Sequence, residues 1–188
     1  MAGGSESGAS RRHPGTVVFL DTLMKHKVII TDDDPSVRLA LGNLLDREGY
    51  EVAMTASGDE ALTRLLEEGP FDLMLLDLNM PGKSGWDTFE RVTVLNPLLP
   101  VLVITARSDQ QSLAKAAGVS ALAEKPLDLP HLLGTIRELI TEPSVNRLRR
   151  LAGRQVTWRQ LAAEPAAGGS RRNAPGVTTW LQSSASAS

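Results

Sequence analysis

Cysteine is absent from the 188-residue sequence, and aromatic residues make up only 4% of it. Without cysteine the chain cannot form disulfides, bind zinc through thiolates or use a thiol nucleophile, and a reducing compartment is allowed. Trp86, Trp158 and Trp180 are too scattered to predict a stacking surface for nucleic-acid bases. No stretch reaches the roughly 18 continuous apolar residues that cross a bilayer. We therefore expect a cytoplasmic protein with no membrane span.

Positive charge is unevenly distributed along the chain. Residues 1–142 contain 13 Lys and Arg against 21 Asp and Glu, a net charge of −8, whereas residues 143–188 contain 7 against 1, a net charge of +6. Gly, Ser and Ala dominate both ends, which bury too little apolar area to offset the cost of ordering. We expect a mobile N-terminal extension over residues 1–26, one domain over 27–142, and a basic C-terminal tail over 143–188. Leucines and arginines in the tail predict a helix over 145–161, and no output domain is recognisable there.

Within residues 27–142, short apolar segments alternate with longer amphipathic ones. The apolar segments are rich in β-branched and aliphatic residues and predict strands over residues 28–30, 51–54, 72–76, 101–104 and 120–123. The amphipathic segments predict helices over residues 36–48, 58–67, 84–95, 110–117 and 129–140. Five such units imply an α/β fold, with a doubly wound five-stranded parallel sheet covered by helices on both faces.

Polar residues follow the ends of four predicted strands. They are Asp32, Asp33 and Asp34 after the first strand, Asp77 after the third, Thr105 after the fourth and Lys125 after the fifth. In doubly wound sheets the chemistry lies beyond the carboxyl ends of the strands. Converging carboxylates repel one another unless they bind a cation, and an oxygen-rich site suits Mg²⁺. A carboxylate nucleophile, a metal, and lysine and hydroxyl donors form a set suited to phosphoryl transfer.

These residues also have structural interpretations. Asp34 precedes Pro35 and a predicted helix, and we expect it to cap that helix. Asp77 alone is compatible with a turn, Thr105 with an ordinary strand position and Lys125 with a solvated loop charge. Helix capping does not require three carboxylates, so we favour metal handling for the first two aspartates.

One segment resembles a known motif. Residues 77–85 read Asp-Leu-Asn-Met-Pro-Gly-Lys-Ser-Gly, which is similar to the phosphoacceptor loop of the response regulator receiver domains of two-component systems. The resemblance covers about residues 27–140 and includes the Asp32-Asp33 pair, Ile104-Thr105-Ala106 and Glu124-Lys125-Pro126. It implies a flavodoxin-like fold with strand order 2-1-3-4-5.

The resemblance also implies residue roles. Asp77 is the expected phosphoacceptor, and the metal ligands are Asp32 acting mainly through water, Asp33, Asp77 and the backbone carbonyl of Asn79. Thr105 and Lys125 are expected to contact the phosphoryl group. Such a protein is a phosphoacceptor that catalyses its own phosphorylation and dephosphorylation, rather than an enzyme acting on other molecules.

Two further positions bear on how such a site would work. Leu122 departs from the family pattern, and Arg107 is at a position that varies within it. Leu122 stands where the family usually has an aromatic residue that responds to movement of the threonine, and a leucine cannot make the same aromatic readout. Arg107, two positions after Thr105, stands where the family tunes phosphoryl lifetime, and the resemblance implies that it alters that lifetime here.

The implied function is a response regulator receiver, a phosphoprotein of signal transduction that uses Mg²⁺. Its expected partners are a histidine kinase or phosphotransfer protein and a downstream protein, with the chain acting as a stand-alone or adaptor regulator. Two alternatives stay open: a DNA-binding regulator that uses the basic tail, since arginines attract phosphates, and a receiver-like module that works without phosphorylation.

Overall fold

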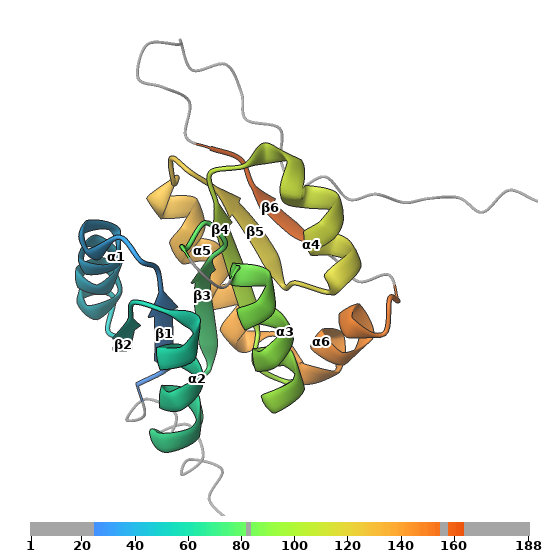
Figure 1. The fold of residues 1–188 in the computed structure, drawn as a ribbon, viewed down its shortest axis with the longest axis horizontal. Helices are drawn as coiled ribbons and strands as arrows, with labels where there is room; N and C mark the ends of the chain where they lie inside the picture. The colour runs from blue at the N-terminus through green and yellow to red at the C-terminus, as the bar shows by residue number, and fades with distance from the viewer. Residues whose placement is uncertain (1–24, 82–83, 155–157, 164–188) are drawn as a thin grey trace, which may run out of the picture.

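Six short segments of the chain form one sheet in which all neighbouring strands run parallel. The structure is a computed structural model, and it describes residues 25–81, 84–154 and 158–163. The strands are β1 (Lys27–Thr31), β2 (Glu51–Thr55), β3 (Leu73–Asp77), β4 (Val101–Thr105), β5 (Ala121–Glu124) and β6 (Arg159–Leu161). Their order across the sheet is β2-β1-β3-β4-β5-β6 (Figure 1). The predicted order 2-1-3-4-5 is therefore confirmed for the first five strands.

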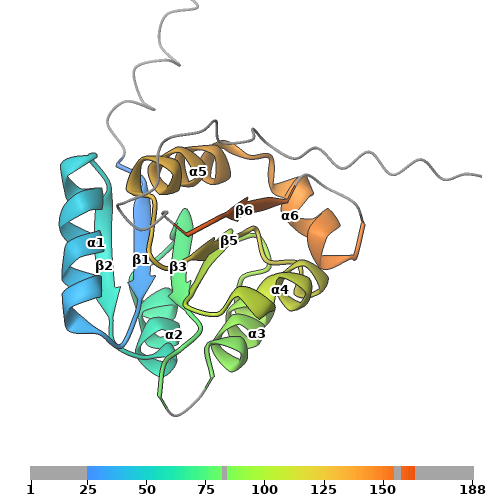
Figure 2. The ribbon, with the colours of Figure 1, turned by 90° about the horizontal axis from the view of Figure 1, so that it is seen from above.

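Helices cover both faces of this sheet. They are α1 (Pro35–Arg47), α2 (Gly58–Glu67), α3 (Gly85–Leu95), α4 (Gln111–Ala117), α5 (Leu129–Thr141) and α6 (Ser144–Leu151), with a short 3₁₀ helix η1 (Ser108–Gln110) before α4. Helices α1 and α5 lie on one face, and α2, α3 and α4 lie on the other (Figure 2). The doubly wound arrangement predicted from the alternation of segments is confirmed.

The central strands β3 and β4 are buried along their whole length and are apolar except for their last residues, as is typical of parallel strands covered on both faces. In β3, Leu73 and Leu75 pack with residues of α1 and α5, whereas Met74 and Leu76 pack with residues of α2, α3 and α4. All five residues of β3 are buried, including the terminal Asp77. The sheet thus brings a carboxylate to the end of its central strand without exposing the strand.

The C-terminal region differs from the prediction. A helix was expected over residues 145–161, but α6 ends at Leu151 and the chain turns at Gly153, which has a φ of 68°. Leu161 of β6 is then 2% exposed and packs in the core on the α1 and α5 face. Pairing of β6 with β5 gives six strands rather than the five expected. The strand forms because of tertiary contacts, since its three residues pair with β5 at the edge of the sheet.

These elements lie beyond the predicted domain boundary at residue 142. Because Arg147 of α6 bonds to Gly118 at the end of α4 and β6 pairs with β5, we propose that the folded unit continues to at least residue 161. Most of the predicted N-terminal extension and the end of the predicted tail, residues 1–24 and 164–188, lie outside the described residues. No helix in the described part of the chain is long and apolar enough to cross a membrane.

Candidate functional site

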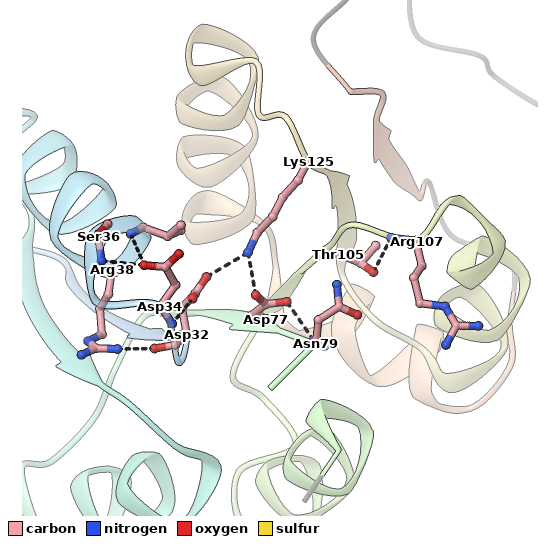
Figure 3. Close-up of polar contacts among 10 residues, drawn as sticks. Asp32, Asp34, Ser36, Arg38, Asp77, Asn79, Thr105, Arg107 and Lys125 are labelled. Atoms are coloured by element: carbon pink, nitrogen blue, oxygen red, sulfur yellow. Dashed lines mark hydrogen bonds and ion pairs between the residues drawn. The ribbon is translucent and has the colours of Figure 1, made fainter. Parts of the chain in front are cut away.

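The carboxyl ends of β1, β3, β4 and β5 meet at one edge of the sheet and carry the polar residues predicted from the sequence. Asp32 directly follows β1, Asp77 ends β3, Thr105 ends β4 and Lys125 directly follows β5. The side chains of Asp32, Asp77 and Lys125 point toward one another (Figure 3). Register pairs Thr31 with Leu76, Asp77 with Ile104, and Thr105 with Glu124, so the four strand ends lie within about one residue of one another.

Three carboxylates gather at this edge. One oxygen from each of Asp32, Asp33 and Asp77 lies within 4.8 Å of the others. Asp32 and Asp77 are only 1% and 3% exposed, whereas Asp33 is open to solvent. Burial raises the pKa of Asp32 above its ordinary value, against the opposing effects of the Asp34 backbone amide and the Lys125 charge. The cluster therefore concentrates negative charge where water screens it poorly.

Lys125 supplies the opposing charge. Its Nζ lies 2.6 Å from Oδ2 of Asp77 and 3.1 Å from Oδ2 of Asp32. Burial by itself lowers the pKa of Lys125, but the hydrogen bond and charge of Asp77 together with those of Asp32 outweigh it and raise the pKa. The amine is therefore a fixed cation between the two buried carboxylates. The Lys125–Pro126 peptide bond is cis.

The loop after β3 holds Asp77 from the backbone side. The amide of Asn79 donates to Oδ1 of Asp77 at 2.9 Å, and the amide of Leu78 donates to the carbonyl of Ile104 at 3.0 Å. A Cβ on Gly85 would lie 2.5 Å from both the carbonyl oxygen of Asp77 and Cα of Leu78. Glycine is thus required there, because the first turn of α3 packs directly on the backbone of the acidic residue.

Thr105 and Arg107 lie on the other side of Asp77. Thr105 is completely buried, and its Oγ1 accepts a hydrogen bond of 3.0 Å from the backbone amide of Arg107. The Arg107 side chain points away from Asp77 (Figure 3) and forms an exposed ion pair of 2.7 Å with Asp109.

Asp34 has the structural role that was expected of it. Its carboxylate accepts hydrogen bonds from the amides of Ser36 at 2.8 Å and Val37 at 3.4 Å. These two amides lower the pKa of Asp34. The prediction that it caps α1 is confirmed, and capping positions the loop that carries Asp32 and Asp33.

Several contacts around the site were not predicted. Arg38 donates to the backbone carbonyl of Asp32. Trp86 Nε1 donates to Oε1 of Gln110 at 3.0 Å, which ties the first turn of α3 to η1. Thr31 and Thr55 share a buried hydrogen bond of 2.9 Å between their hydroxyls. No sequence motif indicates these contacts, since each joins residues on different elements or depends on local loop geometry.

The donor set can be tested for magnesium. Octahedral Mg²⁺ binds oxygen at about 2.1 Å, so its ligands lie up to about 4.2 Å apart. The separation of 4.8 Å or less between the three carboxylate oxygens is close to that span. Nitrogen and sulfur ligands are absent from this cluster, which suits Mg²⁺ better than Zn²⁺. The residues therefore fit a magnesium ion.

Comparison with known proteins agrees with the geometry. The family model of the response regulator receiver domain matches residues 28–137. The chain therefore belongs to the response regulator receiver domain family. The match ends within α5, before α6 and β6.

Individual relatives show how far the likeness extends. Sporulation initiation phosphotransferase F of Bacillus subtilis is 28% identical over 120 residues, which cover 63% of this chain and 96% of that protein. The DNA-binding transcriptional regulator NtrC of Rhizobium meliloti is 34% identical over 118 residues, which cover 62% of this chain but only 24% of that regulator. The chain thus matches nearly all of one relative and about a quarter of the other.

Solved structures give the same result for the fold. A CheY-like receiver domain protein of Methanospirillum hungatei superposes with a TM-score of 0.58 at 28% identity, covering 62% of this chain and 94% of that chain. The response regulator TrrA of Thermotoga maritima, solved in complex with Mg²⁺ and BeF, gives a TM-score of 0.57 at 28% identity and covers 62% and 99% of the two chains.

Proposed function

We propose that this receiver domain accepts a phosphoryl group on Asp77 from a histidine kinase or a phosphotransfer protein, and that the modification switches its binding to a downstream protein. The proposal rests on one observation above the others. A buried carboxylate, Asp77, lies in hydrogen-bond contact with the Lys125 amine and within 4.8 Å of two further carboxylates. A purely structural ion pair needs only one carboxylate.

In the proposed reaction, a carboxylate oxygen of Asp77 forms a bond to phosphorus while the bond from phosphorus to the donor breaks. The leaving group departs with the electron pair, and Asp77 becomes an acyl phosphate. In this proposal the amine of Lys125 and the hydroxyl of Thr105 donate to the phosphoryl oxygens, where charge develops. The chain thereby contributes catalytic groups to its own modification.

Magnesium is the proposed cofactor. The side chains of Asp33 and Asp77 and the backbone carbonyl of Asn79 would hold the ion, with Asp32 acting mainly through water. When bound, Mg²⁺ supplies positive charge that offsets the charge of the carboxylates and the phosphoryl oxygens. The structure of TrrA, whose sequence is 28% identical to this chain, was solved in complex with Mg²⁺ and BeF, and it supports this assignment.

The test is phosphorylation by a small donor. The protein is incubated with acetyl phosphate with and without Mg²⁺, and its intact mass is measured. We expect a gain of one phosphoryl group that requires Mg²⁺ and is lost in Asp77→Asn. The matched control is Asp46→Asn, at an exposed position on α1, which should gain the group as the wild type does. No gain in the wild type, or an equal gain in Asp77→Asn, contradicts the proposal and favours a module that works without phosphorylation.

A nucleic-acid-binding role for the basic tail is not favoured. Of the five arginines in the part of the tail that the structure describes, Arg149 and Arg154 are exposed, but Arg147 and Arg150 are only 1% and 5% exposed and Arg159 pairs with Glu138 at 2.6 Å. Arginines that are buried or paired in this way are poorly placed to contact phosphates.

A further inference from the structure

Buried polar groups without partners are concentrated in one part of the molecule. Among the residues that the structure describes, the buried side-chain nitrogens that lack a hydrogen bond belong to Arg147, Arg150, Trp158 and Arg159. All four residues belong to the C-terminal segment, by which we mean residues 144–154 and 158–161, comprising α6 and β6. A buried donor without an acceptor has lost its hydrogen bonds to water without gaining one to the protein. Packing of this segment therefore carries a desolvation penalty that the rest of the described core does not.

Helix α6 is nevertheless fitted closely to the domain. Arg147 donates to the carbonyl of Gly118 and, at 3.4 Å, to the hydroxyl of Thr93, and its guanidinium carbon lies 5.6 Å from the centre of the Phe89 ring. A Cβ on Gly118 would lie 3.0 Å from the backbone of Arg150. The helix therefore packs on the end of α4 through arginine side chains and bare backbone, and not through an apolar face.

Strand β6 pairs with β5 over three residues, and it is also held by the ion pair of Arg159 with Glu138 at 2.6 Å and by Leu161 in the core. Leu122 is the register partner of Gln160, and the Gln160 amide donates to Oε1 of Glu124 at 3.0 Å. Trp158 packs against the core cluster that contains Leu122, although its indole nitrogen has no partner. A strand of three residues offers only a few ladder hydrogen bonds, so a small displacement of β5 can break them together.

The attachment point adjoins the candidate phosphoacceptor site. Glu124, which holds Gln160, directly precedes Lys125, and the backbone amide of Lys125 donates to the carbonyl of Thr105 at 2.8 Å. The Lys125 amine in turn contacts Asp77 at 2.6 Å. A phosphoryl group on Asp77 adds charge and bulk between Asp77 and Lys125, and the adjustment passes along β5 to the residues that hold β6.

We propose that the C-terminal segment is an intramolecular occupant of the β5 edge that detaches when Asp77 is phosphorylated. This inference rests on the proposed function. In the attached state the edge of β5 is closed. Detachment leaves unpaired those backbone N–H and C=O groups of β5 that face β6, and such an edge accepts an extended segment of a partner protein as an added strand. Phosphorylation thus exchanges an internal strand for an external one.

The absence of cysteine makes a clean test possible. Leu161→Cys places the sole thiol on β6, at a position that is 2% exposed, and Ala53→Cys places one on β2 at the opposite sheet edge, at a position that is 6% exposed. Each variant is treated with acetyl phosphate and Mg²⁺, its intact mass is recorded, and its rate of reaction with N-ethylmaleimide is measured. Labelling of a buried thiol follows the population of the open form when opening is fast.

We expect phosphorylation to accelerate labelling of Leu161→Cys by about tenfold or more while Ala53→Cys changes by less than about twofold. Full phosphorylation by mass with no acceleration at position 161 overturns the inference and leaves the proposed function intact. Acceleration of both thiols indicates general loosening and also overturns it. No gain of phosphoryl mass contradicts the proposed function itself, and with it the detachment.

A second measurement uses the unaltered chain, in case the cysteine variants fold poorly. Hydrogen exchange is followed in peptides that span β5 and β2 before and after phosphorylation. We expect faster exchange of the β5 amides alone, since these border β6. Unchanged exchange in β5 of the phosphorylated protein contradicts the inference.

Discussion

Replacing Gly85 with alanine should damage the phosphoacceptor site through the backbone, without removing any functional group. The new methyl carbon would lie 2.5 Å from both the carbonyl oxygen of Asp77 and Cα of Leu78. Ordinary contact requires about 3.4 Å or more, so α3 and the β3–α3 loop must separate by roughly 1 Å. Both obstructing atoms belong to the backbone, which cannot move aside as a flexible side chain can.

The magnitude follows from that displacement. Overpacking a tightly fitted site costs about 1–3 kcal/mol, and we expect the free energy of unfolding to fall within that range. A misplacement of about 1 Å at a reacting group lowers rates by about 100-fold. The rate of Mg²⁺-dependent phosphorylation by acetyl phosphate should therefore fall by roughly two orders of magnitude.

A second glycine-to-alanine substitution separates the effect of the close contact at position 85 from the general effect of introducing an alanine. Gly134 lies within α5, and a Cβ built there has no atom within 4 Å. Gly134→Ala should raise the free energy of unfolding by about 0.5–1 kcal/mol, because alanine favours the helix. Urea unfolding and phosphorylation time courses on both variants make the comparison. If Gly85→Ala is phosphorylated as fast as Gly134→Ala, the close approach does not position Asp77 and the reasoning is refuted.

Three further predictions concern other parts of the chain. Arg150→Leu breaks a buried ion pair and should lower the free energy of unfolding by about 3–5 kcal/mol, whereas Arg149→Leu, at an exposed position, should change it by less than about 0.5 kcal/mol in the same urea titration. The hydrogen bond from Arg107 lowers the pKa of Asp109 to about 2. Because the folded-state pKa is lowered, the pair's contribution is present above about pH 4 and is lost as the pH falls through about 2; an NMR titration should give that midpoint, and Arg107→Gln should move it up. Gln160→Glu places a carboxylate against the glutamate of β5 and should speed hydrogen exchange of β5 without phosphorylation, whereas unchanged exchange would mean that this contact does not hold β6.

The core of the fold was predictable because both of its signals are local. The alternation of short apolar and longer amphipathic segments identified five strands and five helices that the structure contains. The acidic residues at Asp32 and Asp77 could be assigned to one edge because parallel strands end on the same side. Their meeting with Lys125 needed no long-range information beyond strand order.

The C-terminal segment was not predictable by the same means. Arginine-rich sequence is usually solvated, yet Arg147 is 1% exposed, because its charge is directed at the carbonyl of Gly118 and the ring of Phe89. Strand β6 has only three residues and forms only because β5 offers an edge. Both features depend on surfaces that exist only after the rest of the chain has folded.

Contacts within the site were missed for a related reason. Glycine at position 85 belongs to the recognised motif, but the requirement for it appears only when α3 is packed on Asp77. The bond between Thr31 and Thr55 depends on the register of β1 with β2, which the sequence pattern does not specify. Its effect is to satisfy a hydroxyl in a strand that is otherwise apolar.

The most direct test of the account is to locate the phosphoryl group on the chain. After reaction with acetyl phosphate and Mg²⁺, the protein is digested and the modified peptide is identified by mass spectrometry under conditions that preserve acyl phosphates. The account predicts a single modified residue, Asp77, with no modification at Asp32 or Asp33. A phosphoryl group at any other residue, or none at all, would contradict it.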